Sequence, residues 1–97
     1  MLKNPHDHVE RQAFAAKLRT ARAVLGWTQL ELAREVHLTQ RSIHRLEQGH
    51  SEPKLATVRA FERLWREKGV CFQDLDDGGF ELMVRAATLA SSTTSIQ

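Results

Sequence analysis

The sequence predicts a mainly α-helical fold in which four helices are followed by a C-terminal β-hairpin. Three observations lead to this prediction. Apolar residues recur every three or four positions up to Lys68, which is the period of an amphipathic helix. Thr28 and Thr39 stand where helix N-caps are expected. After Gly69 apolar and polar residues alternate, which is the period of a half-buried strand.

The first helix is expected to run from an N-cap at Asp7, with Glu10 at its N3 position, to about Leu25. Gly26 then provides the stop that helix C-termini prefer. The residues before Asp7 are expected to form a flexible tail. The face turned to the core consists of Phe14, Leu18, Ala21 and Leu25.

Residues 28–49 read as two short helices joined by a tight turn. Thr28 and Glu31 have the spacing of a capping box, and Trp27 and Leu32 that of a hydrophobic staple. The apolar stripe of this helix is expected at Leu30, Ala33 and Val36, widened by Leu32.

The same pattern starts again at Thr39, which can cap a second helix with Leu38 and Ile43 as its staple. Ser42 replaces the Glu of a full capping box, and Gly49 ends the helix. With Ile43 turned inward, the opposite face presents Gln40, Arg41, His44, Arg45 and Gln48. Arginine and glutamine can bond the edges of guanine and adenine, so this layout suits a helix-turn-helix whose second helix reads DNA in the major groove.

Residues 14–68 resemble the Cro/lambda-repressor family of helix-turn-helix DNA-binding regulators, of the xenobiotic-response-element type. The family pattern T-Q-x-E-L-A, then a turn, S-I and L-E-x-G, is present as Thr28-Gln29, Glu31-Leu32-Ala33, Ser42-Ile43 and Leu46-Glu47-Gln48-Gly49. This resemblance implies a four-helix lambda-repressor-like domain that binds double-stranded DNA.

The resemblance also implies residue roles. Base contacts fall to three residues of the second helix: Gln40, Arg41 and Arg45. Gln29 would bind a phosphate and brace the reading helix, and Thr39 would make a methyl contact or a phosphate bond. Arg22 and Glu47 would form an ion pair between the first helix and the end of the reading helix. Family members commonly have Gly where this chain has His37, so the turn is expected to carry slight strain.

A fourth helix is expected from Lys54 to Lys68, with an inward face of Leu55, Val58, Phe61, Leu64 and Trp65. Lys54 stands beside the exit of the helix-turn-helix. We therefore expect Lys54, and His44 on the reading helix, to hold DNA phosphates.

The segment 70–85 is expected to form a β-hairpin whose turn is centred on Asp77-Gly78. Its apolar side should pack on the fourth helix, because a lone two-stranded hairpin is marginal in water. An edge of the hairpin could pair with a second copy, which would make residues 70–85 a dimerisation appendage. Residues 86–97 are expected to form a flexible tail, and residues 7–69 the DNA-binding domain.

The distribution of charge along the chain and the few cysteine and apolar features indicate the class of protein. Residues 1–69 hold 13 Lys/Arg against 8 Asp/Glu, whereas residues 70–97 hold one Arg against four acids. This asymmetry suits a molecule that meets phosphates with one surface. Cys71 is the single cysteine, and apolar runs are short, so we expect a cytoplasmic protein with no membrane span.

No cofactor, metal site or catalytic constellation is expected, since the clustered Asp74, Asp76 and Asp77 lack the ligand spacing of a calcium loop. The sequence therefore predicts a homodimeric DNA-binding transcriptional regulator, a repressor, rather than an enzyme. Two alternatives stay open. One is an antitoxin that binds a toxin protein and its own operator. The other is a degenerate helix-turn-helix used only for protein contacts.

Overall fold

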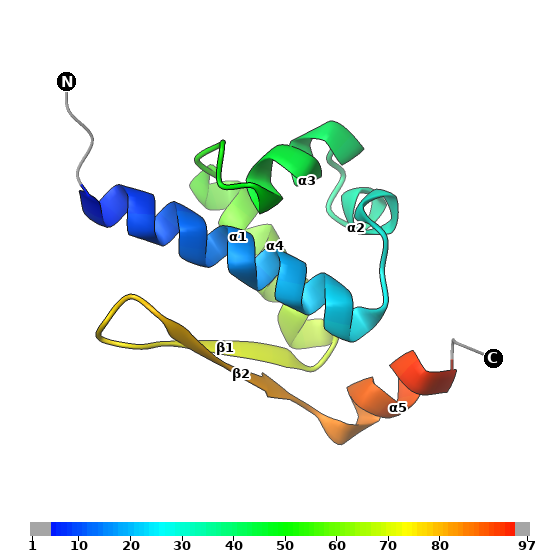
Figure 1. The fold of residues 1–97 in the computed structure, drawn as a ribbon. Helices are drawn as coiled ribbons and strands as arrows, with labels where there is room; N and C mark the ends of the chain where they lie inside the picture. The colour runs from blue at the N-terminus through cyan, green and yellow to red at the C-terminus, as the bar shows by residue number, and fades with distance from the viewer. Residues whose placement is uncertain (1–4, 95–97) are drawn as a thin grey trace.

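The computed structural model describes residues 5–94, with side chains from residue 9 to residue 90. Its elements are, in order, α1 (Pro5–Leu25), α2 (Gln29–Glu35), α3 (Gln40–Glu47), α4 (Leu55–Glu67), β1 (Val70–Asp74), β2 (Phe80–Val84) and α5 (Ala86–Thr94). α1 crosses the molecule, with α2 and α3 on one side of it and the hairpin on the other (Figure 1). This architecture confirms the mainly helical fold with a C-terminal hairpin that the sequence predicts.

α1 starts at Pro5, ahead of the cap expected at Asp7. Proline suits the first helical turn, because the N–H that it lacks would have no partner within the helix there. The helix ends at Leu25 as expected, and Gly26 takes a φ of +72°. Residues 1–4, which belong to the expected N-terminal tail, lie outside the described residues.

One hydrophobic core joins the four helices and the first strand. Phe61 on α4 is fully buried at its centre, with Phe14 of α1 edge-on at 5.7 Å between ring centroids and Trp65 stacked at 5.9 Å. The other buried members of this cluster are Leu18, Ala21, Leu32, Ala33, Ile43, Leu46, Leu64 and Val70.

Two leucines expected in the core are exposed instead. Leu30 is 41% exposed, because the inward face of the short α2 is centred on Leu32 and Ala33. Leu55 is 63% exposed, because it is the first residue of α4 and the core begins further along that helix, at Phe61.

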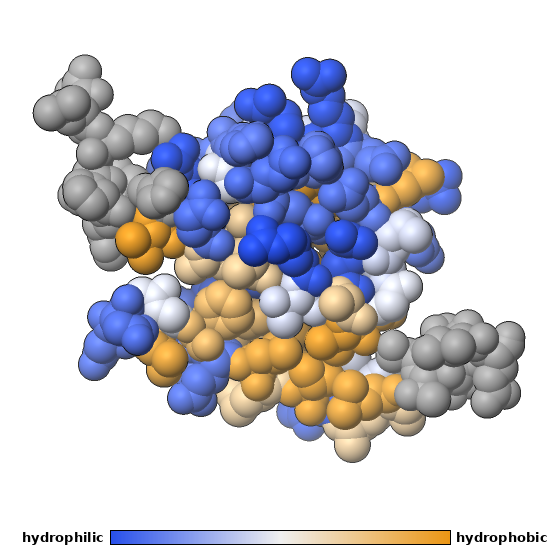
Figure 2. All heavy atoms as spheres, in the orientation of Figure 1, coloured by the Kyte–Doolittle hydropathy of each residue, from blue (hydrophilic) through white to orange (hydrophobic). Residues whose placement is uncertain are grey.

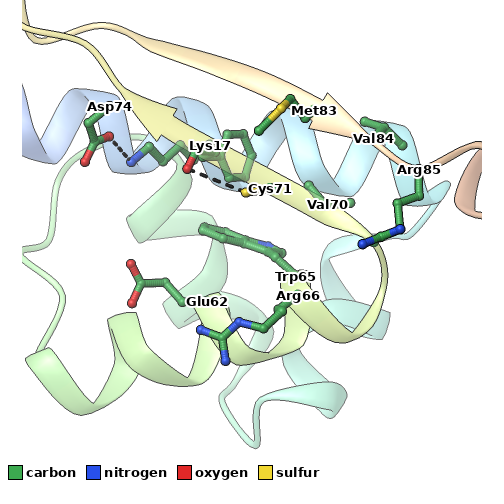
Figure 3. Close-up of a pocket in the computed structure, with 12 residues that line it drawn as sticks. Lys17, Glu62, Trp65, Arg66, Val70, Cys71, Asp74, Met83, Val84 and Arg85 are labelled. Atoms are coloured by element: carbon green, nitrogen blue, oxygen red, sulfur yellow. Dashed lines mark hydrogen bonds and ion pairs between the residues drawn. The ribbon is translucent and has the colours of Figure 1, made fainter.

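The hairpin forms as predicted, and its inner face packs on α4 and α1. The strands are antiparallel, with Phe72 opposite Leu82 and Val70 opposite Val84. Phe72 contacts Trp65 of α4 edge-on, with ring centroids 4.9 Å apart. Lys17 of α1 reaches across to the strand end, where its Nζ lies 2.6 Å from Asp74 Oδ1 (Figure 3). Burial and charge thus fix the hairpin to the helical body.

Its turn is a three-residue loop closed by the pair Leu75 and Gly79. The Leu75 N–H donates to the Gly79 carbonyl at 2.9 Å, and the Asp77 carboxylate accepts from the Gly79 N–H at 2.9 Å. Gly78 takes a φ of +91°, which a glycine adopts without steric cost. The Gly78 N–H also donates to the Leu75 carbonyl at 3.2 Å, so a tight turn followed by a left-handed glycine closes the hairpin.

The C-terminal segment differs from the expected flexible tail. Residues 86–94 form α5, and residues 95–97 lie outside the described part of the chain. The helix starts directly after Arg85, whose N–H donates to the Gly69 carbonyl at 3.0 Å and closes the open end of the hairpin. Thr88 then donates its hydroxyl to the Lys68 carbonyl at the end of α4. This tertiary anchor and the helix-favouring alanines at 86 and 87 outweigh the Ser/Thr-rich composition.

Candidate nucleic-acid interface

α3 is a short helix that is closed at both ends by local hydrogen bonds. The Thr39 hydroxyl accepts from the Ser42 N–H at 3.0 Å, which is the N-cap that the sequence predicts. At the other end Gly49 takes a φ of +73° and donates to the Leu46 carbonyl at 3.1 Å. The His50 N–H bonds to the Arg45 carbonyl at 3.1 Å, which completes a Schellman motif. The length of α3 is therefore set by residues that were visible in the sequence.

The rotation of α3 about its axis is set by burial. Ile43 is fully buried and Leu46 is 6% exposed, so both side chains point into the core. The face turned away from the core is exposed and consists of Gln40, Arg41, His44, Arg45 and Gln48. Figure 2 shows hydrophilic side chains gathered over this side of the molecule. The exposed face of α3 is thus polar and cationic, and the acid of this helix, Glu47, is buried.

Glu47 is the buried charge that connects α3 to α1. Its side chain is 5% exposed and accepts from Arg22 twice, from Nε at 2.8 Å and from Nη2 at 3.1 Å. The hydrogen bond from Arg22 to Glu47 raises the pKa of the guanidinium above its ordinary value and so favours its charged form. Arg22 also donates to the Trp27 carbonyl at 3.1 Å, which ties the same cation to the turn before α2.

Gln29, the first residue of α2, braces α3 from the other side. Its Nε2 donates to Glu47 Oε1 at 3.0 Å and lies 3.5 Å from His44 Nδ1. The amide nitrogen is therefore engaged inside the protein, and any phosphate contact by Gln29 would have to share this donor. His44 itself is exposed, on the outer face of α3.

The three residues implied as base readers do not share one environment. Gln40 and Arg41 extend from the first turn of α3 and make no side-chain hydrogen bond within the described residues. Arg45 lies one turn later, and its Nε donates to the Ser51 hydroxyl at 3.2 Å. Ser51, in the loop after α3, is a positioning residue that the sequence did not single out, because the contact depends on the path of the loop.

The residues implied as phosphate contacts also differ in their surroundings. The Thr39 hydroxyl both accepts from the Ser42 N–H and donates to Ser42 Oγ at 2.9 Å, so its donor hydrogen is used within the cap. Lys54 is exposed and is the N-cap residue of α4, without a side-chain capping bond. Arg19 was not expected at this site, yet its guanidinium donates to the Glu47 carbonyl at the end of α3. Arg19 lies one turn before Arg22 on α1, and this spacing is the feature of the sequence that could have predicted its contact with α3.

The capping box of α2 holds the other end of the two-helix unit. Glu31 accepts from the Thr28 N–H at 2.9 Å, and Thr28 Oγ1 accepts from the Glu31 N–H at 3.1 Å. The first of these bonds favours the carboxylate and lowers the pKa of Glu31 below its ordinary value. The turn that follows α2 contains His37 with a φ of +58°, in the position where the resemblance implies glycine.

The described residues contain neither a membrane span nor a group of metal-ligating side chains. Across residues 5–94 no helix is both long and apolar enough to cross a membrane. Within the same part of the chain, no group of three or more His, Cys, Asp and Glu side chains could hold a metal ion.

Comparison with known proteins places this geometry in a family. The sequence profile of the helix-turn-helix family of Cro/C1 type matches residues 18–64. No curated protein and no solved structure matched the chain. The family is one of DNA-binding regulatory domains and not of enzymes. The matched segment runs from the middle of α1 into α4 and contains the whole exposed face of α3, so residues 18–64 belong to the Cro/C1-type helix-turn-helix family of DNA-binding regulators.

Proposed function

We propose that the protein is a transcriptional repressor that reads double-stranded DNA half-sites in the major groove as a homodimer. The observation that carries this proposal is the exposed face of α3. It combines two arginines and two glutamines with no exposed acid, on a helix whose rotation is fixed by burial. Such side chains make bidentate contacts with base edges in the major groove.

Within this proposal the residues have separate roles. Gln40 and Arg41 are the base readers nearest the N-terminus of α3, and Arg45 reads further along the groove. His44 and Lys54 contact phosphates, and Thr39 joins them when its hydroxyl turns from Ser42 Oγ to a phosphate. Phosphate contacts set the register without reading sequence. Gln29 adds a phosphate contact to its bracing of Glu47. The ion pair between Arg22 of α1 and Glu47 of α3 does not contact DNA but holds α3 in place.

Binding-site selection with the purified protein tests the proposal directly. A pool of random duplexes should enrich one sequence, with two similar half-sites related by two-fold symmetry. A chain with alanine at Gln40, Arg41 and Arg45 serves as the matched control and should enrich nothing, with unchanged helix content by circular dichroism. If the wild-type chain holds no duplex more tightly than arbitrary DNA at moderate ionic strength, the regulator proposal is wrong.

The hairpin is the proposed dimerisation element, because it exposes apolar side chains on the side of the molecule away from α3. Leu82 is 36% exposed and Met83 54% exposed. Figure 2 shows hydrophobic residues gathered over this part of the surface. A chain truncated after Gly69 that keeps its helix content by circular dichroism should lose self-association. If the truncated chain stays dimeric at micromolar concentration, the hairpin is not the dimerisation element.

The same apolar surface favours a second candidate function, an antitoxin that holds a toxin protein and represses its own operator. The two candidates differ in what accompanies the chain. An antitoxin should co-purify with a stoichiometric second protein, and its gene should lie beside a toxin-like reading frame. The repressor should purify alone and bind its selected site without a partner protein. The bases of the operator are read by α3 in either case.

A further inference from the structure

Ser51, in the loop after α3, holds the side chain of Arg45, one of the residues proposed to read bases. Its hydroxyl accepts a hydrogen bond from Arg45 Nε at 3.2 Å. Arg45 is exposed and Ser51 is half-buried, so the contact runs from the outer face of α3 to the body of the loop. Arg41, one turn earlier, makes no side-chain hydrogen bond within the described residues. The two arginines of this face therefore differ in how far the protein restrains them.

The loop that carries Ser51 is itself held in place. Gly49, at its start, is buried, takes a φ of +73° and packs against the Gln12 side chain of α1. The His50 N–H then bonds to the Arg45 carbonyl at 3.1 Å. The same loop thus holds Arg45 twice, at its backbone through His50 and at its side chain through Ser51. These contacts give the Ser51 hydroxyl a defined position relative to α3.

The bond to Ser51 determines which donors of Arg45 remain for DNA. A guanidinium is planar and has five N–H donors, one on Nε and two on each terminal nitrogen. Because Nε already donates to Ser51, the edge of the fork that includes Nε is occupied. The outer edge, between Nη1 and Nη2, still presents two parallel donors. Arg45 is therefore prepared for an end-on bidentate contact.

Guanine is the base that matches this pair of donors. In the major groove guanine presents two adjacent acceptors, O6 and N7, whereas adenine combines its N7 acceptor with an N6 donor. Thymine offers one acceptor beside a methyl group, and cytosine offers a donor. An arginine held end-on can therefore satisfy both donors of its outer edge on guanine alone.

We propose that Ser51 is a positioning residue that holds Arg45 end-on, so that Arg45 reads guanine at one base pair of each half-site. The inference rests on the DNA-reading function proposed above and specifies the base and the residue that fixes the reading geometry. Without this bond the long Arg45 side chain has many rotamers, and its charge is attracted by phosphates as well as by bases. Phosphate contacts carry no sequence information, so loss of the Ser51 hydroxyl should reduce specificity at that base pair.

The contact can be measured without DNA, by NMR relaxation of the arginine side-chain nitrogens. In the wild type we expect a higher Nε–H order parameter for Arg45 than for Arg41, which serves as the internal reference. Ser51→Ala should lower the value for Arg45 to that for Arg41 and leave Arg41 unchanged. Equal order parameters for the two arginines in the wild type, or no change at Arg45 in Ser51→Ala, overturn the proposal.

Binding-site selection tests the consequence for specificity. The wild-type site should contain a guanine whose preference is lost in Arg45→Ala. Ser51→Ala should relax the preference at that same base pair, keep it elsewhere and bind the selected site about three- to tenfold more weakly. Ser51→Thr keeps a hydroxyl and should restore the wild-type preference. If Arg45→Ala relaxes a base pair without guanine, or Ser51→Ala keeps every preference, the proposal is wrong.

His50→Ala is the matched control for the loop. It removes the neighbouring exposed side chain and keeps the backbone N–H that bonds to the Arg45 carbonyl. Its base preference should be that of the wild type. A His50→Ala variant that relaxes the same base pair as Ser51→Ala would assign the effect to the loop as a whole and overturn the role of the hydroxyl. Circular dichroism and urea unfolding check that every variant folds as the wild type does.

A double-variant cycle separates positioning from a direct phosphate contact by Ser51. If Ser51 acts through Arg45, Ser51→Ala has no further effect on binding once Arg45 is alanine. If the Ser51 hydroxyl binds a phosphate instead, Ser51→Ala weakens selected and random duplexes alike, with or without the arginine. This second result overturns the positioning role.

These measurements distinguish failure of this inference from failure of the regulator proposal. If the regulator proposal fails, no duplex is selected, while the relaxation of Arg45 still decides whether Ser51 holds its side chain. If the inference fails and the function holds, the protein selects its site and Ser51→Ala reads that site with the wild-type preference.

Discussion

His37 holds the turn between α2 and α3 in a left-handed conformation, with a φ of +58°. Its N–H bonds to the Arg34 carbonyl at 3.4 Å, and the Leu38 N–H bonds to the Ala33 carbonyl at 2.9 Å. These are the two bonds of a Schellman motif, in which glycine is the usual residue at the left-handed position. A residue with a Cβ has a steric cost there that glycine avoids.

His37→Gly should therefore stabilise the protein by about 1 kcal/mol, because it removes this steric cost. Urea unfolding should show a higher midpoint with an unchanged slope. Gly49→Ala is the matched control, because Gly49 has the same role after α3 with a φ of +73°. This control should destabilise the protein. An unchanged or lower midpoint for His37→Gly would show that the turn carries no strain.

Glu31 makes stability depend on pH in the acidic range. Its hydrogen bond from the Thr28 N–H lowers its pKa in the folded state below the value in the unfolded chain. The unfolded state therefore binds the proton more readily. The stabilisation is complete above the unfolded pKa and is lost as the pH falls through the lower, folded pKa.

Glu31→Gln should therefore unfold more easily than the wild type at neutral pH and equally easily once both glutamate states are protonated. Chemical denaturation of the two proteins over an acid pH series measures this convergence. Glu35→Gln, at an exposed position of the same helix outside the capping box, is the control and should show no such change. A difference between Glu31→Gln and wild type that stays constant down to low pH would contradict the role of the capping box.

Arg41 and Lys54 should affect DNA binding differently, because one is proposed to read a base and the other to hold a phosphate. Arg41→Ala should cost about 1–3 kcal/mol on the selected site and relax the preference at one base pair. Lys54→Ala should weaken selected and random duplexes alike and reduce the salt slope by about one. Fluorescence anisotropy on both duplexes over a salt series measures these effects. Equal losses on both duplexes for Arg41→Ala would rule out base reading by Arg41.

At the scale of elements, α3 is held from several directions at once. Ile43 and Leu46 anchor it in the core, Gln29 of α2 bonds to Glu47, and Arg22 of α1 bonds to the same carboxylate. Each contact restrains the exposed face without using a residue of it. Because two α-helices converge on one buried charge, a change at Arg22 should affect the position of the whole helix.

Arg22→Met should destabilise the protein by about 3 kcal/mol, because it leaves Glu47 buried with Gln29 as its remaining side-chain donor. The double variant Arg22→Met/Glu47→Leu removes the buried charge as well and should recover most of that loss. Thermal or urea unfolding of the single and double variants gives the coupling between them. A double variant that is as unstable as the sum of the single variants would argue against the pair acting as a unit.

Elements differ in how far their sequence predicted them. The starts of α2 and α3 and the end of α3 were predicted because their caps are hydrogen bonds between residues at most five positions apart. α5 was missed because its first turn depends on Gly69 and Lys68, which are far away along the chain. The exposure of Leu55 was missed for a related reason, since helical spacing shows which residues share a face but not where the neighbouring helix ends.

At the scale of the whole molecule, the hairpin closes one side of the core as well as presenting an edge. Val70 is 1% exposed, and Phe72 contacts both Trp65 at 4.9 Å and Phe80 at 5.3 Å between ring centroids. Lys17 lies over the ring of Phe72, at 5.9 Å from its centroid. The hairpin is thus part of the folded body, although residues 18–64 alone match the family.

Phe72→Ala should destabilise the whole protein by about 2–3 kcal/mol, because it removes the ring that fastens the hairpin to α4. Gln73→Ala, at the exposed neighbouring position, should change stability by less than about 0.5 kcal/mol. Unfolding followed by tryptophan fluorescence and by circular dichroism should give one shared transition in each variant. A Phe72→Ala protein as stable as the wild type would mean that the hairpin docks independently of this ring.

The sequence by itself determined the helix-turn-helix, its caps, the residues on the outer face of α3 and the hairpin, because each depends on spacing within a few residues. Only the tertiary structure showed that Gln29 braces α3 through Glu47, that Arg19 and Ser51 bond to the end of α3 and to Arg45, and that residues 86–94 form a helix. Those features depend on contacts between distant segments, and local periodicity contains no information about such distances.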